Sequence, residues 1–425
     1  MGRWFMIDLF QEISQTLSKN KLRTALTGLS VSWGIFILIV LLGAGNGLKN
    51  GVTENFSERA VNRVTLWAGT TSMPHQGLKS GRNLQFSDKE IKAIETEVKE
   101  SSLVAPRIDR SQTISYGSEY GSYTVRGVMP AYAEIEMLKI DAGDGRFVNS
   151  LDVKELNKVM VIDKKIANVL FKDKNPIGEY VKVGNLMFKV VGVNSKKFAW
   201  GTPTAYIPFS TAQMIFNPSR KINNISFTVD GRETKEENEN FNTALRGLMG
   251  RHLNFNPEDR QALWINNAQE DYIETQKIFS AITIFVSIVG ILTLIAGIVG
   301  VSNIMLVSVK ERTREIGIRK AIGAPPWAIL KTVIIEALII TSIFGYIGIL
   351  AGIGLTEAVN FVMEQSANAA AVGDEVQMSV FKNPTVNMSY VLFATLILIG
   401  AGAIAGYMPA RKAVKIKPIE AMRQE

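Results

Sequence analysis

Four long stretches without a charged residue limit the possible folds of this chain more than any other feature. They cover residues 24–48, 278–309, 337–356 and 383–410, and the segments between them have the mixed composition of soluble protein. A membrane crossing takes about 20 mainly apolar residues at a rise of about 1.5 Å each, and a buried helix of a soluble protein seldom stays uncharged that long. The clustering therefore predicts four transmembrane helices.

The charges beside these stretches predict how the chain crosses the membrane. Six Lys and Arg residues and only two Glu residues lie in segment 310–331, and five more Lys and Arg residues follow residue 410. The segment between the third and fourth stretches has four carboxylates and only Lys382. By the positive-inside rule, segment 310–331 and both termini are expected in the cytoplasm. This arrangement explains the net charge of +8 without a nucleic-acid partner.

The segment before the first stretch has apolar residues at four-residue spacing, at Phe5, Leu9, Ile13 and Leu17. This spacing predicts an amphipathic helix at the membrane surface, with a soluble helix packed on a partner as the alternative.

The predicted plan of the whole chain has nine segments. They are a cytoplasmic amphipathic helix at 1–23, a first span at 24–48, an external domain at 49–277, a second span with a stalk at 278–309, a cytoplasmic coupling loop at 310–331, a third span at 332–356, a short external loop at 357–385, a fourth span at 386–410 and a cytoplasmic tail at 411–425.

The external domain is expected to be α+β with two lobes. Alternating apolar residues predict strands at 180–193 and 222–229, and turn residues divide the middle of the domain into short elements. We expect a β-rich distal lobe at about 115–225 and a mixed lobe next to the membrane, formed by the flanking segments. The domain has no Cys, so its folding rests on burial and hydrogen bonding.

The second stretch is longer than a bilayer requires. Its 32 residues would span about 48 Å as a helix, against a hydrocarbon core of about 30 Å. If the helix continues upstream, it would form a rigid stalk that passes force between the two sides of the membrane. A break in the helix near Lys277 would remove this hypothesis.

Residues for catalysis are scarce in this chain. It has two His and no Cys, and no Gly-Lys dipeptide with which a Walker A loop could hold phosphates. The pairs Asp163 with Lys164 and Glu134 with Glu136 are expected to be solvated charges. We therefore expect no catalytic, cofactor-binding or metal site in this chain.

The predicted spans lack the ionisable residues that ion-coupled carriers place at mid-bilayer. They have instead small residues at helical spacing, which allow close helix packing. The pairs are Gly43 and Gly47, Ala296 and Gly300, Gly348 and Gly352, and Gly402 and Gly406.

The sharpest local signal is SVKERTREIGIRKAIGA at residues 308–324. Glu315 lies four residues after Glu311 and four before Arg319, which predicts a short helix with an ion pair across one turn. Ile316, Ile318, Ala321 and Ile322 would then form an apolar surface outside the membrane. Such surfaces often bind partner proteins.

This segment closely resembles the signature of MacB-like permeases, also called FtsX-like permeases, which runs E-R-x-x-E-I-G-I-R-x-A-x-G-A before the third span. The resemblance extends to NKLRTALT at 20–27, LFKDKNPIG at 170–178, PARKA at 409–413 and PIEA at 418–421. It covers nearly the whole chain.

The resemblance implies the permease subunit of an ABC transporter in the inner membrane. It implies a homodimer or a paralogous partner permease, a periplasmic outer domain, and an ATPase that binds ATP and Mg²⁺ on a separate chain, since this sequence begins about 20 residues before the first span. It also implies mechanotransmission, in which ATP hydrolysis reshapes the outer domain. The residues expected to contact the ATPase are Glu311, Arg312, Arg314, Glu315, Ile316, Gly317 and Arg319.

Three functions are compatible with this resemblance. The first is export of drugs, peptides or other envelope substrates with a periplasmic adaptor and an outer-membrane channel. The second is release of lipoproteins, and the third is regulation of a cell-wall hydrolase. The size of the outer domain favours export.

Overall fold

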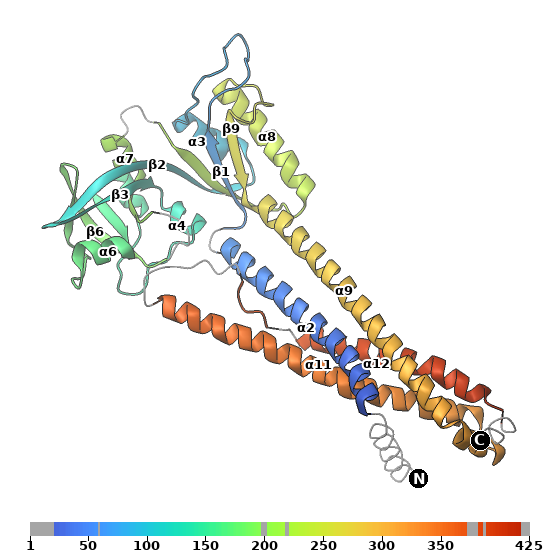
Figure 1. The fold of residues 1–425 in the computed structure, drawn as a ribbon. Helices are drawn as coiled ribbons and strands as arrows, with labels where there is room; N and C mark the ends of the chain where they lie inside the picture. The colour runs from blue at the N-terminus through green and yellow to red at the C-terminus, as the bar shows by residue number, and fades with distance from the viewer. Residues whose placement is uncertain are drawn as a thin grey trace. The chain divides into compact units, whose positions relative to one another are not determined.

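The structure is a computed structural model that describes residues 21–57, 60–196, 202–216, 221–371, 381–385 and 388–417. It divides into a membrane unit, residues 1–52, 278–373 and 379–425, and an outer unit, residues 53–277 and 374–378 (Figure 1). The amphipathic helix predicted at 1–23 lies outside the described residues, except for its last three, which begin the first described helix.

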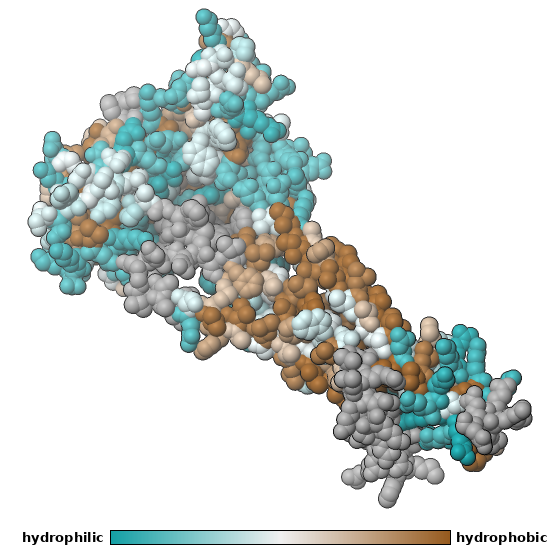
Figure 2. All heavy atoms as spheres, viewed as in Figure 1, coloured by the Kyte–Doolittle hydropathy of each residue, from teal (hydrophilic) through white to brown (hydrophobic). Residues whose placement is uncertain are grey.

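The membrane unit is helical. Its helices are α2 (Lys21–Ser57), α9 (Ala268–Glu311), α10 (Thr313–Ala321), α11 (Pro326–Ala371) and α12 (Met388–Lys415). In the described part of the chain, four of these, α2, α9, α11 and α12, are long and apolar enough to cross a membrane. Hydrophobic residues form much of the visible surface of the spans (Figure 2). The predicted class of four transmembrane helices with an α+β external domain is confirmed.

Helix α11 is longer than the sequence indicated. The third span was expected at 332–356 and a loop at 357–385, but α11 runs from Pro326 to Ala371. Its start suits proline, which has no N–H to leave unpaired in the first turn of a helix. Its extension follows from segment 357–371, which is rich in Ala and Glu and has neither Gly nor Pro.

Close contacts between helices hold the membrane unit together. A Cβ on Gly348 of α11 would collide with the backbone of Ser32 in α2, and one on Gly406 of α12 would lie 2.8 Å from the Ala337 Cβ in α11. Gly47, Gly352 and Gly402 also face neighbouring segments in this way, while Gly43 is buried and Gly300 is half-buried. Three further close approaches, at Gly28, Gly290 and Gly345, were not among the predicted pairs of small residues.

The outer unit has one mixed sheet of nine strands, ordered β3-β7-β4-β6-β5-β2-β8-β1-β9. The strands are β1 (Arg63–Ala68), β2 (Ser101–Tyr116), β3 (Glu119–Val128), β4 (Val159–Asp163), β5 (Tyr180–Val183), β6 (Leu186–Asn194), β7 (Thr204–Pro208), β8 (Asn224–Val229) and β9 (Leu263–Asn267). The helices are α3 (Asp88–Glu97), α4 (Ala131–Ile135), α5 (Ser150–Lys154), α6 (Lys164–Phe171), α7 (Phe209–Phe216) and α8 (Lys235–Leu253). Pairs β3–β7 and β4–β6 are parallel, and the other pairs are antiparallel.

Two lobes with separate cores make up the outer unit. The first lobe packs α3 and α8 against β1, β8 and β9, around residues such as Phe227 and Leu245. The second lobe packs α6 against β3 to β7, around residues such as Phe188. Strand β2 joins them, because it pairs with β8 near its start and with β3 and β5 toward its end. The expected boundary at 115 therefore falls inside one continuous strand.

Of the four charged side chains expected in solvent, Glu134 and Lys164 are exposed, whereas Glu136 and Asp163 are buried. The expectation was therefore wrong for Glu136 and Asp163. Arg63 of β1 and Glu136, which follows α4, form an ion pair of 2.7 Å in which their side chains are only 12% and 7% exposed. Asp163 accepts hydrogen bonds from the Asn194 Nδ2 atom at 2.8 Å and the Thr204 backbone N–H at 2.6 Å. Burial raises the pKa of Asp163. These groups connect elements of the fold, because a buried charge is stable only when it is paired.

Candidate coupling site

The segment between α9 and α11 folds as a helix with short connections. Only Arg312 separates α9 from α10, which Gly323 then ends with a φ of 99°. The backbone N–H groups of Gly323 and Ala324 donate to the carbonyls of Lys320 and Arg319, which is the Schellman pattern. The predicted short helix is therefore present, and most of the predicted loop 310–331 is helical.

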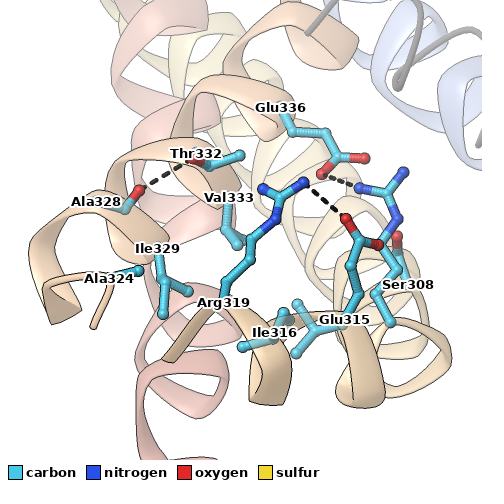
Figure 3. Close-up of a pocket in the computed structure, with 12 residues that line it drawn as sticks. Ser308, Glu315, Ile316, Arg319, Ala324, Ala328, Ile329, Thr332, Val333 and Glu336 are labelled. Carbon is cyan, nitrogen blue, oxygen red and sulfur yellow. Dashed lines mark hydrogen bonds and ion pairs between the residues drawn. The ribbon is translucent and has the colours of Figure 1, made fainter. Parts of the chain in front are cut away.

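A pocket of about 170 Å³ lies at the junction of α9, α10 and α11 (Figure 3). We call it the coupling pocket. Its lining residues are Ser308, Val309, Arg312, Glu315, Ile316, Arg319, Ala324, Ala328, Ile329, Thr332, Val333 and Glu336. All of them come from the membrane unit, and the lining combines apolar side chains with two acidic and two basic groups.

Two ion pairs lie in the coupling pocket, and Figure 3 shows both. The Arg319 NH2 atom is 2.7 Å from the Glu315 Oε1 atom, with both side chains about half exposed. The Arg312 NH1 atom is 3.5 Å from the Glu336 Oε2 atom, and Glu336 is buried. The first pair lies on the α10 surface, where solvent weakens it, whereas the second joins the start of α10 to α11.

The predicted ATPase-contacting residues divide into two groups. Glu311, Arg314, Glu315 and Arg319 are exposed and Arg312 is half-buried, so they remain candidates for contact. Ile316 and Gly317 are buried, with Ile316 part of the core that the spans share. Their predicted contact with the ATPase does not fit this burial. Both lie on the buried face of α10.

Three of the four residues predicted to form the apolar surface, Ile318, Ala321 and Ile322, are exposed, and Ile316 is buried. Ile318 and Ile322 are 43% and 82% exposed, and Trp327 at the start of α11 is 68% exposed. Sequence reasoning did not include Trp327 among the contact residues. Its position in the first turn of α11 places it outside α10, and a helix of nine residues has too few turns for its pattern to show which face is buried.

The C-terminal half of α10 also contacts α12. The Lys320 Nζ atom donates to the backbone carbonyls of Val414 at 2.6 Å and Ile416 at 2.8 Å. Sequence reasoning missed this contact, because no pattern in the sequence relates residues so far apart in the chain.

Helix α9 reaches this site without a break. It begins at Ala268, directly after β9 of the outer unit, and continues through Lys277 to Glu311 over 44 residues. The break near Lys277 that would remove the stalk hypothesis is therefore not present.

Two known family domains match this chain, and together they include residues of both units. Residues 24–240 match the MacB-like periplasmic core domain, and residues 279–418 match the FtsX-like permease C-terminal domain. The chain belongs to the MacB-like family of ABC transporter permeases. The first match covers the first span and most of the outer unit of this MacB-like permease, and the second covers most of the other three spans.

Two similar proteins are named macrolide export ATP-binding/permease protein MacB. The one from Acinetobacter baylyi is 28% identical over 98% of this chain and 60% of its own length. The one from Wolinella succinogenes is 30% identical over 99% of this chain and 62% of its own length. The MacB-like permease therefore spans about three fifths of the length of these relatives.

Among solved structures, the periplasmic region of MacB from Actinobacillus actinomycetemcomitans aligns with 53% of the MacB-like permease and 96% of its own chain. The sequence identity is 20% and the TM-score is 0.43.

Proposed function

We propose that this chain is the permease component of an ABC exporter that works by mechanotransmission. The ATPase is a separate subunit that binds ATP and Mg²⁺ and docks on α10 in the cytoplasm. Both termini are cytoplasmic, the spans lie in the inner membrane and the outer unit is periplasmic. The charge distribution beside the spans supports this orientation.

The continuity of α9 is the observation that carries this proposal. One helix of 44 residues begins after a strand of the outer unit and ends one residue before α10. An α-helix resists stretching and bending, because each turn is held by backbone hydrogen bonds. A displacement of α10 by the ATPase is therefore passed to the first lobe of the outer unit without transport of cargo through the spans.

The cargo is proposed to be a drug, peptide or other envelope substrate. The names of the similar proteins, which refer to macrolide export, support an export function. Export to the outside needs a periplasmic adaptor and an outer-membrane channel, and two copies of the permease form the dimer that two ATPase subunits would drive. Purification from membranes in mild detergent, followed by mass spectrometry, tests this: an accompanying adaptor supports export, whereas lipoproteins or a cell-wall hydrolase contradict it.

Charge exchange in α10 tests the docking surface. In Glu315→Arg, the pair with Arg319 is replaced by repulsion, and we expect co-purification of the ATPase to fall several-fold. The double exchange Glu315→Arg with Arg319→Glu restores the pair within α10 but presents the charges in reverse order. Binding should stay low in the double variant, and full recovery would show that the pair only stabilises α10.

A matched control for this experiment exists in the outer unit. Lys235 and Glu239 of α8 form an ion pair of 3.5 Å across one helical turn, with side chains 40% and 56% exposed, and Lys235 also pairs with Glu274 at 2.7 Å. The variant Glu239→Arg breaks a pair of the same kind away from α10. It should leave ATPase binding unchanged.

An insertion tests the stalk. Two glycines between Lys277 and Ile278 add flexibility within α9, and we expect ATPase binding to persist while export falls to background. The same insertion at Gly117, in the exposed turn between β2 and β3, is the control and should retain export. Export that survives the insertion in α9 would overturn mechanotransmission through this helix.

A further inference from the structure

Lys320 is bound to the end of a helix distant in sequence. An α-helix leaves its last carbonyls without partners inside the helix, and they carry partial negative charge. The ammonium group of Lys320 donates to the carbonyl of Val414 in the last turn of α12 and to that of Ile416 just after it. A charged donor on two carbonyls forms a stronger contact than a neutral one.

Helix α10 is also bound at its start. Arg312, the residue before α10, pairs with the buried Glu336 of α11. Between these two contacts, Ile316 packs into the core that also contains Ala410 and Ala413 of α12. Helix α10 is therefore attached to α11 at its start, to the bundle core in its middle and to α12 at its end.

We propose that Lys320 is a positioning residue that makes α10 and the end of α12 move as one body. This inference rests on the proposed function, in which the ATPase displaces α10. Without Lys320, α10 would keep its contacts with α11 and with the bundle core but would lose its charged contact with the end of α12. With it, α12 moves as well, and α11 follows because Gly402 and Gly406 of α12 lie against Thr341 and Ala337 of α11.

Lys320 differs from the lysines of α12 itself in burial and in the helix that it comes from. Lys412 and Lys415 in the last turn of α12 also complement the negative end of that helix, but both are exposed. Lys320 is only half-exposed and comes from a different helix. Its contact therefore joins two elements, whereas a lysine of α12 stabilises that helix alone.

The experiment measures the distance between α10 and α12 in the permease alone. The chain has no native cysteine, so Ile322→Cys and Lys415→Cys supply the only thiols for spin labels. Pulsed electron–electron double resonance in nanodiscs, with the labelled chain diluted in unlabelled chain so that distances within one copy are measured, should give one narrow distance distribution. Lys320→Met removes the donor but keeps an unbranched side chain, and it should broaden the distribution. Lys320→Arg, which also donates to carbonyls, should restore it.

Lys331→Met removes an exposed lysine of α11 and should leave the distribution narrow. An unchanged width in Lys320→Met, or no recovery in Lys320→Arg, would overturn the proposal. Because this measurement omits the ATPase, it is independent of the docking hypothesis.

A second measurement relates the contact to transport. If the proposed function holds, the Lys320→Met complex should bind the ATPase and hydrolyse ATP while export falls several-fold. Export equal to that of the parent complex would show that α12 does not take part. Failure of the parent complex to bind an ATPase would instead contradict the proposed function and leave the distance result standing.

Discussion

Glycine has different roles in the two units of this molecule. In the outer unit, Gly117, Gly178 and Gly231 have positive φ values and open space around the missing Cβ, so they allow turns. In the membrane unit, Gly348 and Gly406 lie inside helices and against neighbouring helices. Among the described glycines of that unit, only Gly323 has a positive φ.

The difference follows from the solvent of each unit. In water, burial of apolar side chains stabilises a fold, and glycine serves where the backbone must turn. In a bilayer, lipid is as apolar as the helix surface, so association depends on close packing between helices. The two units also differ in buried charge. The outer unit contains the ion pair of Arg63 with Glu136, in which the side chains are 12% and 7% exposed, whereas the spans have no charged residue at their centres.

The largest effect is expected from the buried ion pair of the outer unit. Glu136→Ala leaves Arg63 buried without its carboxylate, which should lower the free energy of unfolding by roughly 3–5 kcal/mol. The loss of stability is measured by thermal unfolding of the full chain, with proteolysis of the outer unit as the readout. Glu136→Gln is the matched control and should cost less, because it keeps a hydrogen-bond acceptor. A loss in Glu136→Ala no larger than that in Glu136→Gln would contradict the prediction.

A smaller effect is expected at the contact between α2 and α11. In Gly348→Ala, the new methyl group collides with the backbone of Ser32, so the helices must separate at a cost of about 1–3 kcal/mol. Gly354→Ala on the same helix is the control, since a Cβ there meets no atom within 4 Å. Thermal inactivation in detergent compares the two. Equal stability would show that α2 and α11 tolerate a wider spacing.

Substitution of Gly117, in a turn, should lower the stability less than substitution of Gly348, between two helices. In Gly117→Ala, no neighbour is struck, but the residue must keep a φ of 58°, which costs roughly 1–2 kcal/mol for an L residue. Gly117→Asn should lose less, because Asn tolerates this conformation. Thermal unfolding of the outer unit measures both. If Asn and Ala cost the same, backbone strain is not the reason for glycine at this turn.

The smallest effect concerns the pH dependence of one loop. Asp259 accepts hydrogen bonds from the Ser72 hydroxyl and from the backbone N–H groups of Ser72 and Met73. Burial alone would raise its pKa, but these hydrogen bonds outweigh burial and lower the pKa. The stabilisation is therefore complete above the ordinary Asp pKa of about 3.9 and is lost as the pH falls through the lower folded-state pKa.

Amide exchange measures this loss. As the pH falls below about 3.9, exchange at Ser72 and Met73 should accelerate relative to Asp259→Asn, in which the side chain does not titrate. Because intrinsic exchange depends on pH equally in both proteins, the ratio isolates the carboxylate. A constant ratio across this range would contradict the assigned role of Asp259.

The sequence predicted the parts of the fold that depend on local composition. The four uncharged stretches predicted the spans, and the position of Glu315 relative to Arg319 predicted α10 and its ion pair. Contacts between distant segments left no such pattern, so the bonds from Lys320 to α12 and the pairing of Arg63 with Glu136 were missed. The burial of Ile316 was not predicted, because its apolar character fits both a docking surface and a core.

The unbroken course of α9 makes the permease sensitive to helical phase. Each residue of an α-helix advances about 1.5 Å and turns about 100° around the axis, since 3.6 residues make one turn. Deleting one residue from the middle of α9 would therefore rotate everything beyond it by more than a quarter of a circle, while shortening it very little. In the proposed mechanism, the number of residues between β9 and α10 therefore matters for rotation as well as for displacement.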